Sequence, residues 1–494
     1  MSMVGFVRSN ATKAAQAVGD ASSPDANVKA IARHPWATSH GSNFFTSGSL
    51  VVAPSLARSL GDAFWATLVP QILEQEPAAR HAVLAISALH EDFGTTAKAR
   101  SMGRLDNVTA LTTRAEASSD VSAGCAYALK HYNAAIRIVL ENQVSNTETL
   151  LTVSLLFTCI ELLQGSTDAA VKHCQHGVRV RNNSKLPPEL TAAFSHMSVF
   201  PELFDAVGAT INIDAEGEIN RCTADEMRTP MQARQALDVV MAQGARVIRL
   251  ALGDENGHMS CSKQYLQSEQ FHAHRALRLW WEDFAALRRR LSSTLRVSDS
   301  DAALLRLLEV RWLVSNVLLE TCLNKAVDVF DAYLPRYKRI VELADQEMAA
   351  RCASQSPTAC FSFDMGYLPL LYIVAFKCRE LRLRIRALVL LKDLSCARET
   401  IWDASVIYAT LSRIIEVEHG LVLDEERMRS ETNPYPEELL DSDSKRIVWF
   451  NNTDEVHLDV EDEDNTVVYR RIQLFFPAPD GTVVPLIDYT TTKY

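Results

Sequence analysis

The chain has 494 residues, of which 47% are hydrophobic and 22% charged, and its formal net charge is −11. These fractions are typical of a folded protein, and the low content of glycine (18) and proline (17) argues against a loop-rich β protein. Phosphate contacts need clustered Lys and Arg, so the acidic balance argues against nucleic-acid binding by most of the surface. The short basic runs at 288–290 and 382–386 lie inside helical patterns, which predicts solvated helix faces.

The ten cysteines follow no framework spacing, and no two of them form a Cys-x-x-Cys pair. Scattered cysteines of this kind indicate reduced thiols in a cytosolic or nuclear protein. Each is expected to pack in the interior as a small hydrophobic residue.

The N-terminal residues 1–45 are rich in Ser, Ala, Asn and Gly and show no sustained period, which predicts a disordered leader. Residues 1–19 contain no acidic residue but carry Arg8 and Lys13, a composition with a faint likeness to a transit peptide. The disordered leader is the favoured interpretation.

Two amphipathic helices are predicted within residues 64–91, and they meet at Pro77. Proline suits the first turn of the second helix, because its missing N–H has no partner at that position. Residues 93–120 are small and polar, and we expect them to form a loop.

The next helices are expected at 126–140, 146–164 and 169–180. The middle one is apolar on nearly all sides, which predicts a central, buried helix, and Gly165 is the expected stop signal. Residues 212–228 are acidic and polar and should form an insertion loop. Helical patterns then resume, at 230–252, 265–292, 300–325, 326–353, 364–391 and 394–419.

The C-terminal part changes character, because residues 467–476 and 483–487 have the composition of strands and 478–481 that of a turn. The predicted fold is therefore all-α, an array of packed antiparallel helix pairs with a small C-terminal β-hairpin. The predicted domains are a leader at 1–45, a helical domain at 46–440 and an acidic segment with the hairpin at 441–494. No uninterrupted apolar run reaches the roughly 18–20 residues that a membrane span needs, and the longest candidate is 368–376.

A possible metal-binding pair lies in the helix predicted at 169–180, where His173 and His176 are three positions apart and flank Cys174. Two imidazoles at this spacing could share a transition metal on one helix face. No third or fourth ligand can be identified nearby in the sequence. Partly exposed helix residues are therefore the favoured interpretation.

Other histidines give weaker signals. His90 and Glu91 begin a zinc-protease motif, but position 94 is Gly, so the second histidine of that motif is missing. His272 and His274 are two positions apart and would face different ways on a helix. No phosphate loop and no nucleophile elbow occurs.

The acidic run at 454–464, just after Trp449 and Phe450, resembles an acidic-hydrophobic activation segment. A solvated loop before the hairpin is the favoured interpretation, and the run lacks the Asp-Asp-x-x-Asp motif of terpene cyclases. The apolar stripe at 367–376 could line a small-molecule pocket, but core packing is expected. No catalytic, cofactor-binding or metal-binding residue is nominated, and no enzymatic activity is expected.

Five segments, in this order, resemble the regulatory region of the fungal six-cysteine zinc-cluster transcription factors. The first is FWATLVPQILEQEPAARHAVLAISALHE at 64–91. The others are AYALKHYNAAIRIVL at 126–140, LLFTCIELLQGSTDAAVKHCQHGVRV at 155–180, GYLPLLYIVAFKCRELRLRIRALVLL at 366–391 and IWDASVIYATLSRIIEVE at 401–418. One such segment would be a weak signal, whereas five in family order are a strong one.

The chain departs from the family pattern at the DNA-binding segment. In the family, six cysteines bridge two zinc ions in a short basic N-terminal segment that contacts DNA. This chain has no cysteine before Cys125 and no basic segment there. Zinc ligation and direct DNA reading are therefore assigned to no residue, and zinc is expected only if such a segment is encoded upstream.

The resemblance implies a regulator that resides in the nucleus and acts through its helical region. Its expected partners are proteins, either a second copy or a complete family member, and a small-molecule effector is compatible with the same role. No direct DNA binding by this chain and no membrane association is expected. The alternative is a cytosolic helical adaptor or ligand-binding protein that has no role at promoters.

Overall fold

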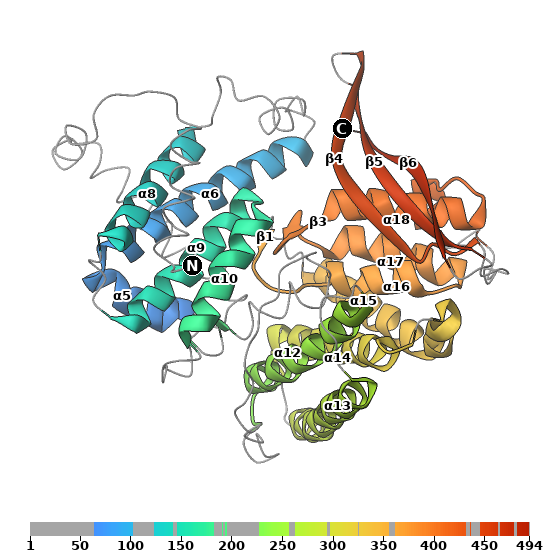
Figure 1. Cartoon of the computed structure of the whole chain (residues 1–494), viewed down its shortest axis with the longest axis horizontal. Helices are drawn as coiled ribbons and strands as arrows, with labels where there is room; N and C mark the ends of the chain where they lie inside the picture. The colour runs from blue at the N-terminus through green and yellow to red at the C-terminus, as the bar shows by residue number, and fades with distance from the viewer. Residues whose placement is uncertain are drawn as a thin grey trace. The chain divides into compact units, whose positions relative to one another are not determined.

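The computed structural model in Figure 1 is dominated by helices and has a small antiparallel sheet near its C-terminus, which confirms the predicted fold class. It describes residues 64–101, 123–141, 146–181, 190, 193–194, 227–255, 262–293, 297–324, 326–354, 361–430, 435, 445–462, 465–478 and 482–493. The predicted leader at 1–45 and nearly all of the predicted insertion at 212–228 lie outside these residues.

The chain divides into two compact units, which are considered separately below. The first comprises Met1–Pro201, Asp205–Asp214 and Cys360–Asp364, and the second comprises Glu202–Phe204, Ala215–Ala359 and Met365–Tyr494.

The first unit is a helical bundle in which α9 (Thr147–Gln164) is buried on nearly every side. Its other described helices are the short η2 (Phe64–Leu68), α5 (Val69–Gln75), α6 (Pro77–Ser101), α8 (Ala123–Leu140) and α10 (Thr167–Arg181). Helix α6 packs against α8 and α9, and α9 packs against α10. Helix α6 begins at Pro77 as predicted, but it continues to Ser101 through part of the predicted loop at 93–120.

Local signals explain both ends of α9. The Asn146 side chain accepts a hydrogen bond from the backbone N–H of Thr149 at 2.8 Å, which caps the N-terminus. Gly165 has a φ of 73°, a left-handed conformation that glycine adopts without strain, and it ends the helix. The structure thereby confirms the central helix predicted at 146–164, which begins after Asn146 and ends before Gly165.

Helix α9 is also long and apolar enough to cross a membrane by length and composition, with a mean hydropathy of 1.3 over 18 residues. Among the described residues α9, and not 368–376 as expected, is therefore the longest candidate, because the Thr, Ser and two Glu residues that interrupt its apolar letters still leave the mean hydropathy at 1.3. Within the fold 78% of the helix is buried, as expected for the central helix of a bundle.

Gly177 in α10 lies against a buried aromatic ring. A Cβ atom at this position would come within 2.6 Å of Cζ of Phe194, whose side chain is fully buried. Gly177→Ala is therefore expected to lower the free energy of unfolding by about 1–2 kcal/mol, since overpacking outweighs the gain in helix propensity. Chemical denaturation followed by circular dichroism would measure the change.

Gly244 in α12 (Pro230–Glu255) offers a matched control. Nothing lies within 4 Å of a Cβ atom built there, so Gly244→Ala should stabilise its helix by about 0.5–1 kcal/mol. Equal effects of the two substitutions would contradict the packing explanation for Gly177.

The second unit packs consecutive helices against one another. Helix α12 contacts α13 (Lys263–Ser292) and α14 (Asp299–Thr321), and α17 (Leu381–Leu394) contacts both α16 (Leu368–Lys377) and α18 (Ala404–His419). The remaining helices are η3 (Val327–Tyr333), α15 (Leu334–Ser354) and α19 (Glu425–Arg429). The helix expected at 364–391 is thus two helices, separated by residues 378–380.

The C-terminal sheet has three strands in the order β4–β5–β6, formed by β4 (Trp449–Asp462), β5 (Asn465–Pro477) and β6 (Val483–Lys493). The predicted hairpin is β5–β6, with Leu474 opposite Leu486. The predicted solvated loop in the acidic run was wrong, because residues 454–462 belong to β4, which pairs antiparallel with β5. Figure 1 shows α18 beside this sheet.

Candidate functional site

The break between α16 and α17 interrupts an otherwise continuous helical stretch of the second unit. Cys378 adopts an extended conformation (φ −72°, ψ 143°), although residues 378–380 include neither Gly nor Pro. In an unbroken helix the carbonyl groups of Ala375 and Lys377 would accept from the N–H groups four residues later. Here Arg384 Nε donates to the Ala375 carbonyl at 2.8 Å, and Arg446 donates to the Lys377 carbonyl. Guanidinium groups therefore satisfy two of the carbonyls that the break leaves open.

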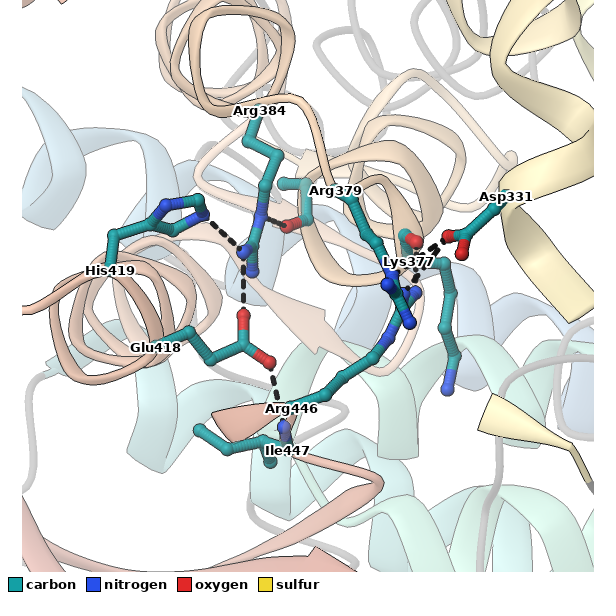
Figure 2. Close-up of polar contacts among 9 residues, drawn as sticks. Asp331, Lys377, Arg379, Arg384, Glu418, His419, Arg446 and Ile447 are labelled. Carbon is teal, nitrogen blue, oxygen red and sulfur yellow. Dashed lines mark hydrogen bonds and ion pairs between the residues drawn. The ribbon is translucent and has the colours of Figure 1, made fainter. Parts of the chain in front are cut away.

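Arg384 forms a fully buried ion pair with Glu418, as Figure 2 shows. The Nη1–Oε2 distance is 2.5 Å, and each side chain is 1% exposed. The other carboxylate oxygen of Glu418 accepts a hydrogen bond from the backbone N–H of Ile447 at 2.7 Å. The pair thus connects α17, the end of α18 and the segment that leads into β4.

A second carboxylate, that of Asp331 in η3, contacts two guanidinium groups. The distances from its Oδ1 atom are 3.0 Å to Arg379 Nε and 3.2 Å to Arg446 Nη1. Figure 2 shows how Arg446 reaches Asp331 and the Lys377 carbonyl from the segment that also contains Ile447. We call the set of Asp331, Lys377, Arg379, Arg384, Glu418, His419 and Arg446 the ionic cluster.

His419 completes the ionic cluster at the C-terminus of α18. Arg384 Nη1 lies 3.1 Å from His419 Nε2. Because a guanidinium group can only donate, Nε2 must accept, so the imidazole is neutral with its proton on Nδ1. Burial, and then the positive charges of Arg384 and Lys445, lower the pKa of His419 to about 4.

The lowered pKa of His419 makes the free energy of unfolding depend on pH. The unfolded histidine titrates near its ordinary pKa of about 6.5, so between about pH 6.5 and 4 the unfolded state binds more protons than the folded state. The free energy of unfolding should therefore fall as the pH falls through this window. Wild type should lose about 1–2 kcal/mol more than His419→Gln between about pH 6.5 and 4.5. Parallel pH curves for the two proteins, from urea denaturation, would contradict this.

Lys377 occupies the last position of α16, beside two aromatic rings. Its Nζ atom lies 4.2 Å from the Phe376 ring centroid and 4.9 Å from that of Phe330. Burial, followed by the charge of Arg446, lowers the pKa of Lys377 to about 7, while Glu418 acts in the opposite direction. The ionic cluster therefore contains an amine that is partly neutral near physiological pH.

The histidine pair considered as a metal site is divided between two environments. His173 is 1% exposed, and its Nε2 atom lies 3.3 Å from the hydroxyl of Tyr132, which donates to Glu161 at 2.6 Å. Ser154 donates to the His173 carbonyl, whereas His176 is only partly buried. His173 is thus a core residue in a polar network, and not the partly exposed residue that the sequence suggested.

The other residues singled out in the sequence do not converge. His90 lies in α6, and His272 and His274 lie in α13. Across the part of the chain that the structure describes, no three His, Cys, Asp or Glu side chains are grouped so that they could hold a metal ion. The apolar stripe at 367–376 is mostly buried in the second unit, with Tyr372 and Phe376 packed against Phe450.

The prediction of a solvated helix face at 382–386 was wrong at Arg384, whose side chain is 1% exposed, although one signal for its burial was present in the sequence. Arg384 follows Leu381 by three positions, and Glu418 follows Ile414 by four, so both charges lie on the apolar faces of their helices. A charge at a core position predicts a buried partner. Which charge is the partner of which depends on the tertiary fold.

No family model, no curated protein and no solved structure significantly matches this chain. The family resemblance therefore remains a prediction from the five sequence segments. Chemically, the ionic cluster can hold a helix break in place and can present one amine, that of Lys377.

Proposed function

We propose that this chain is a transcriptional regulator of the fungal zinc-cluster type that acts through its helical regulatory region. Its role is to bind protein partners, either a second copy or a complete family member, or a small-molecule effector. Direct reading of DNA is not assigned to these 494 residues.

The observation that carries this proposal is the order of the five segments that resemble the family. A helical regulatory region is what the resemblance implies, and the described fold is compatible with it. Two of the segments also supply the buried ion pair of the ionic cluster, since 366–391 contains Arg384 and 401–418 contains Glu418. The charged positions of these segments therefore have a shared structural role.

The charge of the chain supports a role through partners. A formal net charge of −11 disfavours contact with phosphate groups, whose binding requires clustered Lys and Arg. Binding to proteins or to small molecules does not require clustered Lys and Arg. A regulator of this kind would reach promoters through another protein.

Deletion of the gene in its native host, followed by transcript profiling and localisation of the tagged protein, tests the proposal. We expect a defined set of transcripts to change and the protein to be found in the nucleus. Restoration by the full chain, but not by Glu418→Ala, would link the effect to the folded second unit. An unchanged transcript profile together with a protein outside the nucleus would refute the proposal and favour the cytosolic adaptor.

A further inference from the structure

Lys377 has no carboxylate partner among the described residues, whereas Lys338 and Lys392 form ion pairs with Glu380 and Glu425. Its side chain keeps some exposure to solvent but is densely surrounded by protein atoms. The Nζ atom rests against the rings of Phe376 and Phe330, at 4.2 and 4.9 Å from their centroids. Two elements, α16 and η3, thus enclose the amine.

Within the described residues, no carboxylate lies within ion-pair distance of this amine. The acidic groups nearest in the ionic cluster have other partners, because Asp331 contacts Arg379 and Arg446, and Glu418 is bound by Arg384. Two charged groups act on the Lys377 amine from neighbouring segments: Arg446 lowers its pKa and Glu418 raises it, and the effect of Arg446 is the larger.

Lys392 in α17 provides the contrast. Its amine also lies over an aromatic ring, 4.9 Å from the centroid of Tyr408. Unlike Lys377, it forms an ion pair with Glu425. Both amines thus contact an aromatic ring, but only that of Lys392 is paired with a carboxylate.

We propose that Lys377 is a site of covalent acylation by acyl thioesters. The lone pair on Nζ attacks the carbonyl carbon, so that an N–C bond forms and the C–S bond breaks. The thiol leaves with the proton that the amine loses. The acyl thioester is the only co-reactant, and no oxidant or reductant is needed.

The amide formed by acylation is less costly to hold at this partly buried position than the ammonium group is. An amide carries no charge, so acylation removes one of the four basic groups of the ionic cluster (Lys377, Arg379, Arg384 and Arg446), which contains only two carboxylates, both paired with arginine. An uncharged group costs less to hold in a partly buried position than an unpaired charge does. The lowered pKa of Lys377, about 7, agrees with this geometry, because only the neutral amine is a nucleophile. The inference does not depend on the proposed role in transcription.

The test is acylation of the purified full chain with the acetyl thioester of N-acetylcysteamine, at a series of pH values, with site occupancy measured by peptide mass spectrometry. At about pH 7 the occupancy of Lys377 should exceed that of Lys392 by about tenfold, because the Lys392 amine is held in an ion pair with Glu425, whereas the Lys377 amine has no carboxylate partner among the described residues. The rate at Lys377 should rise with pH and level off above about pH 8, because the pKa of this amine is lowered to about 7.

The same reaction in concentrated urea is the control, since unfolding removes both environments and should bring the two occupancies together. Occupancy of Lys377 that is equal to or below that of Lys392 in the folded protein would overturn the proposal. Failure of Lys377 to react at any pH would also overturn it. A tenfold preference that persists in urea would do the same, because the preference would then come from local sequence alone.

Discussion

Glu418→Ala is expected to lower the free energy of unfolding by about 3–5 kcal/mol, because it leaves the guanidinium group of Arg384 buried without its carboxylate. Both side chains are 1% exposed, so solvent cannot replace the lost partner. The substitution also removes the acceptor for the backbone N–H of Ile447. Urea denaturation followed by circular dichroism would measure the loss.

Two further variants separate charge from packing at this pair. Glu418→Gln keeps an oxygen acceptor for Ile447 and should cost less than Glu418→Ala. The double variant Arg384→Met with Glu418→Met removes both charges and should recover part of the stability that Glu418→Ala loses, since the Ala375 carbonyl and the Ile447 N–H still lose their partners. A double variant as unstable as Glu418→Ala would contradict the uncompensated-charge explanation, as would a single variant within about 0.5 kcal/mol of wild type.

Phe157→Ala should lower the free energy of unfolding by a similar amount, about 3–5 kcal/mol. Phe157 lies in α9 and is fully buried, with edge contacts to the rings of Tyr132 at 5.1 Å and His173 at 5.6 Å between centroids. Truncation would create a cavity at the centre of the first unit. Differential scanning calorimetry would measure the accompanying fall in Tm.

Val422→Ala is the control for the truncation, since Val422 is 79% exposed and its removal should change stability by less than about 0.5 kcal/mol. If Phe157→Ala were equally mild, α9 would not be the packed core helix described here.

Periodicity and capping residues were sufficient to predict most of the helical fold. For α9 the sequence contains a complete description: an Asn cap at the start, apolar residues on all sides and Gly165 at the end. Likewise, α6 begins at Pro77 because proline fits only the first turn. Each of these features acts within a few residues, so a single sequence reveals it.

The features that the sequence did not reveal depend on distant residues. No Gly or Pro marks the break after α16. Its stability depends instead on Arg384 and Arg446, which donate to the carbonyls of Ala375 and Lys377, and Arg446 is 69 residues from Lys377 in sequence. The strand β4 was missed for a related reason. Its acidic composition is typical of a solvated loop, and pairing with β5 decides its conformation.

The central claim, that the helical region regulates transcription through partners, is tested most directly by tethering. The full chain would be fused to a heterologous DNA-binding domain upstream of a reporter gene in a fungal cell. We predict that reporter expression rises or falls relative to the DNA-binding domain alone, that Glu418→Ala abolishes the change and that Val422→Ala preserves it. Reporter expression equal to that of the DNA-binding domain alone, with the fusion protein present at a normal level in the nucleus, would contradict the claim.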